Sequence, residues 1–98
     1  MPRKRSGRMQ VDRSRFVIQA ENRADVLARV VLLFHRLNIE ITSLYLVRRR
    51  ASETMRMTVT VEADRDRAVR VEAHLYKVVQ VKSVRLESAG AEVRGDLR

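Results

Sequence analysis

Apolar and polar positions alternate at the start of the patterned part of the chain, and the period then becomes helical. Phe16, Ile18 and Ala20 alternate with Val17 and Gln19, which predicts a short first strand. We interpret Asn22 as the N-cap of a following helix. The Asp25 carboxylate is placed to bond back to the cap and to interact favourably with the positive end of the helix dipole. Asn38 is expected to close this helix in a left-handed conformation. Five residues predict its apolar face: Leu27, Val30, Val31, Phe34 and Leu37.

A second strand is predicted over residues 39–48, and its apolar side chains fall on both parities. Such a strand is expected to be central in a sheet or covered by a partner. Strict alternation would place four apolar residues on one face, Ile39, Ile41, Tyr45 and Val47, and two on the other, Leu44 and Leu46. Residues 48–53 form a polar connection, and nearly strict alternation over 54–62 predicts a third strand with four inward residues, Met55, Met57, Val59 and Val61.

A second helix follows, capped by Asp64 or Asp66, and residues 80–87 read as a last strand. The buried stripe of this helix is predicted to be Ala68, Val71, Leu75 and Val78. The order strand, helix, strand, strand, helix, strand favours an α+β, ferredoxin-like fold: a four-stranded antiparallel sheet with both helices on one face. Many unrelated functions share this plan, so it does not identify one.

The positive charge is concentrated at the start of the chain. Residues 1–15 hold six basic residues and one acidic residue, a net charge of +5 out of +9. We predict a basic flexible arm over 1–14, one domain over 15–88 and a flexible C-terminal tail over 89–98. The arm could dock on an acidic surface or touch phosphate. It lacks the apolar region of a secretory signal, and we expect a cytoplasmic protein.

The residue types argue against catalysis, metal binding and membrane insertion. There is no cysteine, and neither His35 nor His74 has a second ligand at metal-binding spacing. The three glycines make no phosphate loop, and no nucleophile is paired with an acid or base, so an enzyme is not expected. The longest apolar run, residues 30–34, is too short to cross a bilayer.

Single-stranded RNA binding is a known use of this plan, and it depends on aromatic side chains on the open face of the third strand. No aromatic residue is expected on that face here. It carries Thr54, Arg56, Thr58, Thr60 and Glu62. The sequence therefore argues against a nucleic-acid partner.

Three segments resemble the ACT domain of the small, regulatory subunit of acetolactate synthase (acetohydroxyacid synthase, AHAS). The first, residues 17–44, contains E-N-x-x-x-x-L-x-R-V, met by Glu21, Asn22, Leu27, Arg29 and Val30. The others are RMTVTV at 56–61 and HLYKVVQVKSV at 74–84, and the last is the most specific. The similarity spans 16–87, with no room for the second domain of longer members, so it implies a short form.

The resemblance implies a non-catalytic subunit of branched-chain amino acid biosynthesis that binds and activates the catalytic subunit. That catalytic subunit would carry thiamine diphosphate, Mg and FAD, and this chain would bind no cofactor. ACT units pair as homodimers or larger assemblies, and many members transmit feedback by valine. The resemblance places the effector between the turn after the first strand and the second strand of a neighbour, with these candidate residues: Asn22, Ala24, Asp25, Val26, Asn38, Ile39, Glu40 and Ile41.

Two of these positions depart from the family pattern. Asp25 stands where a glycine is usual, and Glu40 where an asparagine often opens the strand. Two carboxylates beside a valine carboxylate would be costly unless paired, although they could also grip its ammonium group. We therefore expect valine feedback to be weakened or absent, with Asp25 serving the helix.

Arg48, Arg49 and Arg50 form either a solvated loop or a contact with an acidic patch of the catalytic subunit. The alternative to a synthase subunit is a free-standing ACT-type amino-acid sensor or homo-oligomeric interaction module with another partner.

Overall fold

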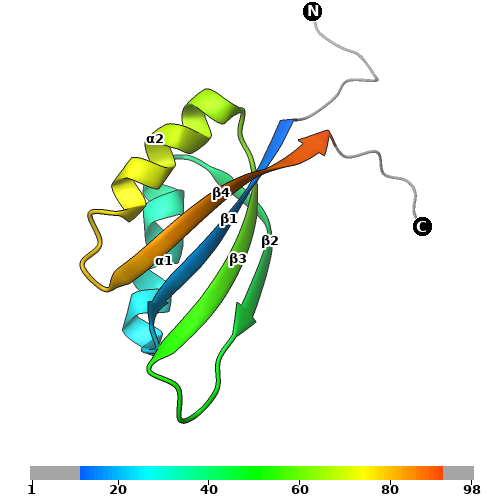
Figure 1. The fold of residues 1–98 in the computed structure, drawn as a ribbon. Coiled ribbons are helices and arrows are strands. Elements are labelled where there is room, and N and C mark those ends of the chain that lie inside the picture. The colour runs from blue at the N-terminus through cyan, green and yellow to red at the C-terminus, as the bar shows by residue number, and fades with distance from the viewer. Residues whose placement is uncertain (1–11, 92–98) are drawn as a thin grey trace, which may run out of the picture.

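A computed structural model describes residues 12–91 of the chain. The predicted arm and tail lie outside these residues, apart from 12–14 and 89–91. Six elements follow in order (Figure 1): β1 Asp12–Glu21, α1 Ala24–Arg36, β2 Glu40–Val47, β3 Thr54–Glu62, α2 Arg65–Leu75 and β4 Val81–Ala91. The predicted order is confirmed.

The four strands form one antiparallel sheet in the order β2-β3-β1-β4, with both helices on one face (Figure 1). This is the predicted ferredoxin-like fold. The core lies between the helices and the sheet, where Phe16 and Phe34 meet edge to face with ring centroids 5.3 Å apart. The four inward residues predicted for β3 are all buried. We call the other side of the sheet the open face.

The first and the last strand of the chain extend beyond their predicted ends. β1 begins at Asp12 rather than Phe16, because Ser14 turns inward and its hydroxyl donates to the Ala63 carbonyl at 3.0 Å. Neighbouring Arg15 lies 3.5 Å from Glu87 on β4. Residues 12–14, which the charge pattern assigned to the arm, are therefore part of the sheet. β4 likewise continues to Ala91 instead of ending at Glu87.

The buried face of α1 is rotated from the predicted one. Val26 and Leu33, absent from the predicted stripe, are buried together with Val30 and Phe34, whereas Val31 is only half-buried. Val26, Val30, Leu33 and Phe34 fall at i, i+4, i+7 and i+8, the spacing of a single helix face. Leu27 and Leu37, which the pattern placed on the face, flank the core and are partly buried.

The end of α1 and the start of α2 are formed as the sequence predicts. Asn38 adopts a left-handed conformation with φ of 60°. Its N–H donates to the His35 carbonyl, and the Ile39 N–H donates to the Phe34 carbonyl, each at 3.0 Å, which is a Schellman closure. At the start of α2 the Asp64 carboxylate accepts from the Arg67 N–H at 2.9 Å. The two predicted signals are confirmed.

The second strand differs most from its prediction, because β2 is an edge strand and contains a bulge. Ile41 pairs with Val61 but Ser43 with Thr60, so Thr42 is extra and the parity changes there. Leu44 and Leu46 therefore share the helix side with Ile41, and Tyr45 and Val47 lie on the open face. Strict alternation had wrongly placed Ile41 on the same face as Tyr45 and Val47. Leu44 is 41% exposed and Tyr45 70%. The central-strand alternative is excluded, and the edge is open to a partner.

Candidate functional site

The turn between β1 and α1 is organised by Asn22, but not as a helix cap. The residue at the N-cap position is Arg23, whose side chain makes no capping bond. The Asn22 amide instead donates to two carbonyls of the β2–β3 connection, Arg49 at 3.0 Å and Ser52 at 2.9 Å. Its carbonyl oxygen accepts from Arg48 Nε at 2.7 Å. The capping prediction for Asn22 is wrong, because Asn22 lies one residue before the N-cap position and its side-chain oxygen accepts from Arg48 instead of a helix N–H group.

We call residues 48–53, which join β2 to β3, the hairpin loop. The Asn22 N–H also donates to the Glu53 carbonyl at 3.0 Å, so main chain and side chain together fasten the hairpin loop to the turn. Within the loop the Ser52 N–H donates to the Arg49 carbonyl at 3.0 Å. The structure thus places two sets of candidates side by side: Asn22 of the effector set, and the Arg48–Arg50 set of the partner contact.

Asp25 lies in the first turn of α1 and is paired with Arg23, which the capping pattern did not indicate. Arg23 donates to its two carboxylate oxygens at 3.0 and 2.7 Å, and also to Glu21 at 3.2 Å. The hydrogen bond from Arg23, and then its charge, lower the pKa of Asp25 below the ordinary value. Arg23 stands between two acidic residues in the sequence, which was the available signal. The negative charge at position 25 is therefore partly neutralised within the turn.

The neighbouring candidates Ala24 and Val26 differ in accessibility. Ala24 is exposed at the first position of α1, where N–H groups lack partners within a helix. The Val26 side chain is fully buried, and its N–H donates to the Arg23 carbonyl at 3.1 Å. A ligand at this turn could therefore use the backbone of position 24 but not the Val26 side chain.

The remaining effector candidates lie at the far end of α1. The 13 residues of this helix span about 20 Å, so Asn38 and Glu40 are separated from Asn22 within one chain. Glu40 is exposed, Ile39 is buried and Ile41 half-buried. Arg67 donates to the Asn38 carbonyl at 3.1 Å, beside a shallow pocket that His74 also lines. Within one chain the effector candidates therefore fall into two separate groups, and Asp25 and Glu40 do not belong to the same one.

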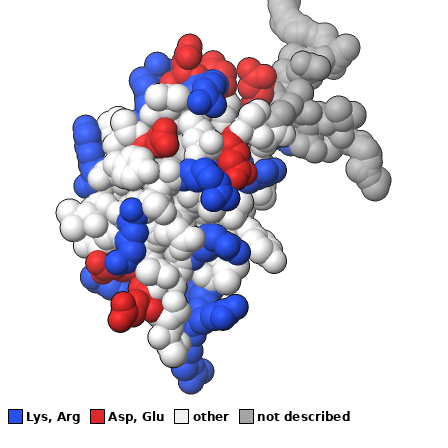
Figure 2. All heavy atoms as spheres, in the orientation of Figure 1, with Lys and Arg blue, Asp and Glu red and all other residues white. Residues whose placement is uncertain are grey.

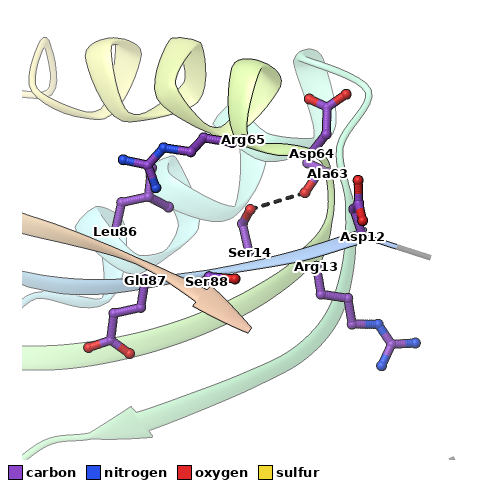
Figure 3. A pocket seen from close by; sticks show the side chains of 9 residues that line it. All are labelled: Asp12, Arg13, Ser14, Ala63, Asp64, Arg65, Leu86, Glu87 and Ser88. Atoms are coloured by element: carbon purple, nitrogen blue, oxygen red, sulfur yellow. Dashed lines mark hydrogen bonds between the residues drawn. The ribbon is translucent and has the colours of Figure 1, made fainter. Parts of the chain in front are cut away.

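Two other depressions flank the sheet. One lies at the hairpin end of the open face and is lined by Gln19, Val47, Arg49, Ser52, Thr54, Met55 and Arg56. The other lies at the opposite end (Figure 3), where residues of both charges line it and the Ser14 hydroxyl is engaged by Ala63. Within residues 12–91 no group of three or more His, Asp or Glu side chains could hold a metal ion. Across this same part of the chain, no helix is long and apolar enough to span a membrane.

Comparisons with known proteins are consistent with this fold. A family model described as AHAS small subunit-like ACT domain matches residues 16–83, which include the turn, the hairpin loop and α2. No curated protein sequence matches the chain.

Solved structures share the fold at low sequence identity. An uncharacterized protein from Thermotoga maritima is 17% identical with a TM-score of 0.65, covering 80% of this chain and 96% of its own. The ACT domain of a GTP pyrophosphokinase from Chlorobium tepidum is 13% identical with a TM-score of 0.68, covering 88% and 96%. An ACT domain protein from Streptococcus pneumoniae is 17% identical with a TM-score of 0.61, covering 81% and 91%.

Proposed function

Since the chain belongs to the family of AHAS small subunit-like ACT domains, we propose that it is a regulatory subunit that binds and activates the catalytic subunit of acetolactate synthase. In this proposal the catalytic subunit carries thiamine diphosphate, Mg and FAD, and the present chain contributes no reacting group. ACT domains are regulatory and generally non-catalytic. The observation that carries the proposal is the family match over residues 16–83, which runs from within β1 to the start of β4.

The geometry of the turn supports a weakened response to valine. Arg23 is the N-cap residue of α1, and both carboxylate oxygens of Asp25 already accept from its guanidinium group. An incoming valine carboxylate would have to compete with Asp25 for this guanidinium or meet its charge directly. Both outcomes cost binding free energy relative to a turn that has glycine at this position. We propose that activation persists while valine inhibition is weak or absent.

Reconstitution with the cognate catalytic subunit tests the proposal. Acetolactate formation is measured as this chain is titrated in, at saturating thiamine diphosphate, Mg and FAD. We expect a saturable rise in rate, and little inhibition on adding valine, leucine or isoleucine. A rate that does not change at any concentration of this chain would refute the subunit assignment. Strong inhibition by valine would refute only the proposal on feedback.

The second candidate is a free-standing ACT sensor or homo-oligomeric module with another partner. It is favoured by the coverage of the Thermotoga and Streptococcus chains, which are matched over 96% and 91% of their lengths and so consist almost entirely of one such unit. A chain that binds an amino acid in calorimetry, yet neither binds nor activates the catalytic subunit, would support this candidate.

A further inference from the structure

The basic residues of the open face are paired at one end of the sheet and unpaired at the other. Toward the end opposite the hairpin loop, Arg15 and Arg85 lie 3.5 and 2.8 Å from Glu87. Toward the hairpin loop, Arg49 and Arg56 are exposed and form no ion pair with any residue of the described segment. They line one depression, in which every other lining residue is uncharged. The unbalanced positive charge therefore collects at the hairpin end.

The surface view agrees with this distribution. Lys and Arg side chains gather toward the lower tip of the molecule in Figure 2, where Figure 1 places the connection between β2 and β3. Arg56 lies on the open face because its register partners there are Gln19 on β1 and Val47 on β2. The depression thus has a floor of strand residues and a rim made by the hairpin loop.

The rim is held in place by hydrogen bonds that reach outside the loop. Asn22 donates to the carbonyls of Arg49 and Ser52, and the Ser52 hydroxyl donates to the Thr54 carbonyl at 2.9 Å. The Thr54 N–H returns a bond to the same hydroxyl at 3.2 Å. A loop fixed before binding loses less entropy when it docks than a mobile one does. The backbone of Arg49 is thereby oriented in the free chain.

We propose that this depression is the docking surface for an acidic protein partner, with a partner carboxylate seated between Arg49 and Arg56 and with Asn22 as the residue that positions the rim. The inference rests on the proposed function, since it takes the catalytic subunit as that partner. Guanidinium groups bind carboxylates through paired charged hydrogen bonds, which suits a desolvated contact.

The chemistry of the face favours protein over nucleic acid. Single-stranded nucleic acids need aromatic side chains for base stacking, and Tyr45 is the one aromatic residue that the strands of residues 12–91 turn to the open face. Glu53 of the hairpin loop and Glu21 at the end of β1 line a neighbouring depression together with Arg23 and Lys82, so acidic groups interrupt the basic surface along which a continuous phosphate backbone would run. A protein surface with one or two carboxylates avoids both problems.

Charge reversal with a matched control tests the surface. The double variant Arg49→Glu/Arg56→Glu is compared with Arg65→Glu/Arg70→Glu, two exposed arginines of α2 on the other side of the sheet. The affinity for the catalytic subunit is taken from activation titrations at low and high salt. We expect the first variant to weaken binding by about tenfold per charge and to flatten its salt dependence, while the α2 variant stays within about twofold of wild type.

The role of Asn22 is tested separately with Asn22→Ala. Removing a positioning residue should weaken docking several-fold and leave the salt dependence as in wild type, because no charge is lost. Wild-type binding by the double arginine variant would overturn the surface and leave the proposed function standing. Absence of any binding by the wild-type chain overturns both. Single-stranded RNA retained by wild type and released by the double variant would overturn the protein partner in favour of nucleic acid.

Discussion

Replacing Asn22 by alanine is the sharpest test of how this end of the molecule is held. The substitution removes two amide donors, to Arg49 at 3.0 Å and Ser52 at 2.9 Å, and the acceptor of Arg48 Nε at 2.7 Å. The backbone bond from the Asn22 N–H to the Glu53 carbonyl remains. The variant therefore loses the side-chain tie and keeps the main-chain tie.

The expected magnitude follows from the exposure of each bond. A hydrogen bond contributes about 0.5–1.5 kcal/mol net, with exposed bonds at the low end. The bond to Ser52 is partly buried and the other two are exposed, so their sum is about 1–2 kcal/mol. For a domain of this size, each kcal/mol lowers Tm by about 4–8 °C. Asn22→Ala should therefore lower Tm by about 5–15 °C.

Urea unfolding followed by circular dichroism measures the loss of stability, and amide hydrogen exchange reports the hairpin loop itself. We expect faster exchange at residues 49–53 and little change in α2. Gln80→Ala is the matched control, since it removes one exposed bond, from Arg29 at 2.9 Å, and should change stability by less than about 0.5 kcal/mol.

Asn22→Asp separates the donors from the acceptor. Aspartate can still accept from Arg48, but it has no donor for the two carbonyl oxygens and places negative charge against them. We expect it to be at least as destabilising as alanine. If aspartate retained wild-type stability, or if alanine left the hairpin exchange unchanged, the tie between Asn22 and the loop would be refuted.

Three further outcomes are expected. Asn38→Ala should cost about 1 kcal/mol in urea unfolding because alanine resists the left-handed conformation, whereas Asn38→Gly should be tolerated. Arg23→Gln should raise the pKa of Asp25 toward its ordinary value in an NMR titration. Because the pairing lowers the pKa of Asp25 in the folded state, it stabilises the fold above the pKa of the unfolded state. This stabilisation is lost as the pH falls through the pKa of the folded state. Tyr76→Phe removes a hydroxyl that donates to the Val84 carbonyl at 2.9 Å and accepts from the Val84 N–H at 3.1 Å. We expect the free energy of unfolding to fall by about 1 kcal/mol. Because the substitution also frees these backbone groups on the edge strand β4, we expect more self-association in analytical ultracentrifugation.

The sequence pattern correctly predicted those features of the fold that depend only on residues close together in the chain. The bounds of β3 match the alternating run of residues 54–62, and Asn38 ends α1 because its own conformation suits the left-handed position. The bulge at Thr42 could not be read from β2 alone, since it appears only in the register with β3. Once a single extra residue is inserted, every later side chain of the strand changes face.

The same distinction explains the site. Asn22 and Asp25 carry the sequence signature of a capped helix, yet Asn22 bonds to residues 26 to 30 positions away and Asp25 bonds to a side chain two positions before it. A capping pattern contains no information about a loop that folds back later in the chain. Charge counts likewise could not separate the paired Arg15 from the unpaired Arg56, because pairing depends on which strands become neighbours.

The arrangement of the two ends of α1 constrains how any regulation can work. The turn at Asn22 and the strand start at Glu40 are a helix length apart, so a ligand small enough to be an amino acid cannot contact both within one chain. If it contacts both, it must bridge two chains, and ligand binding and pairing then reinforce one another by mass action. The exposed edge of β2, with Leu44 and Tyr45, is open for such pairing. Asn22 also fixes the hairpin loop through its amide donors. A ligand that accepted hydrogen bonds from these donors would loosen the rim of the proposed docking surface. Effector binding would then be coupled to partner binding through this one side chain.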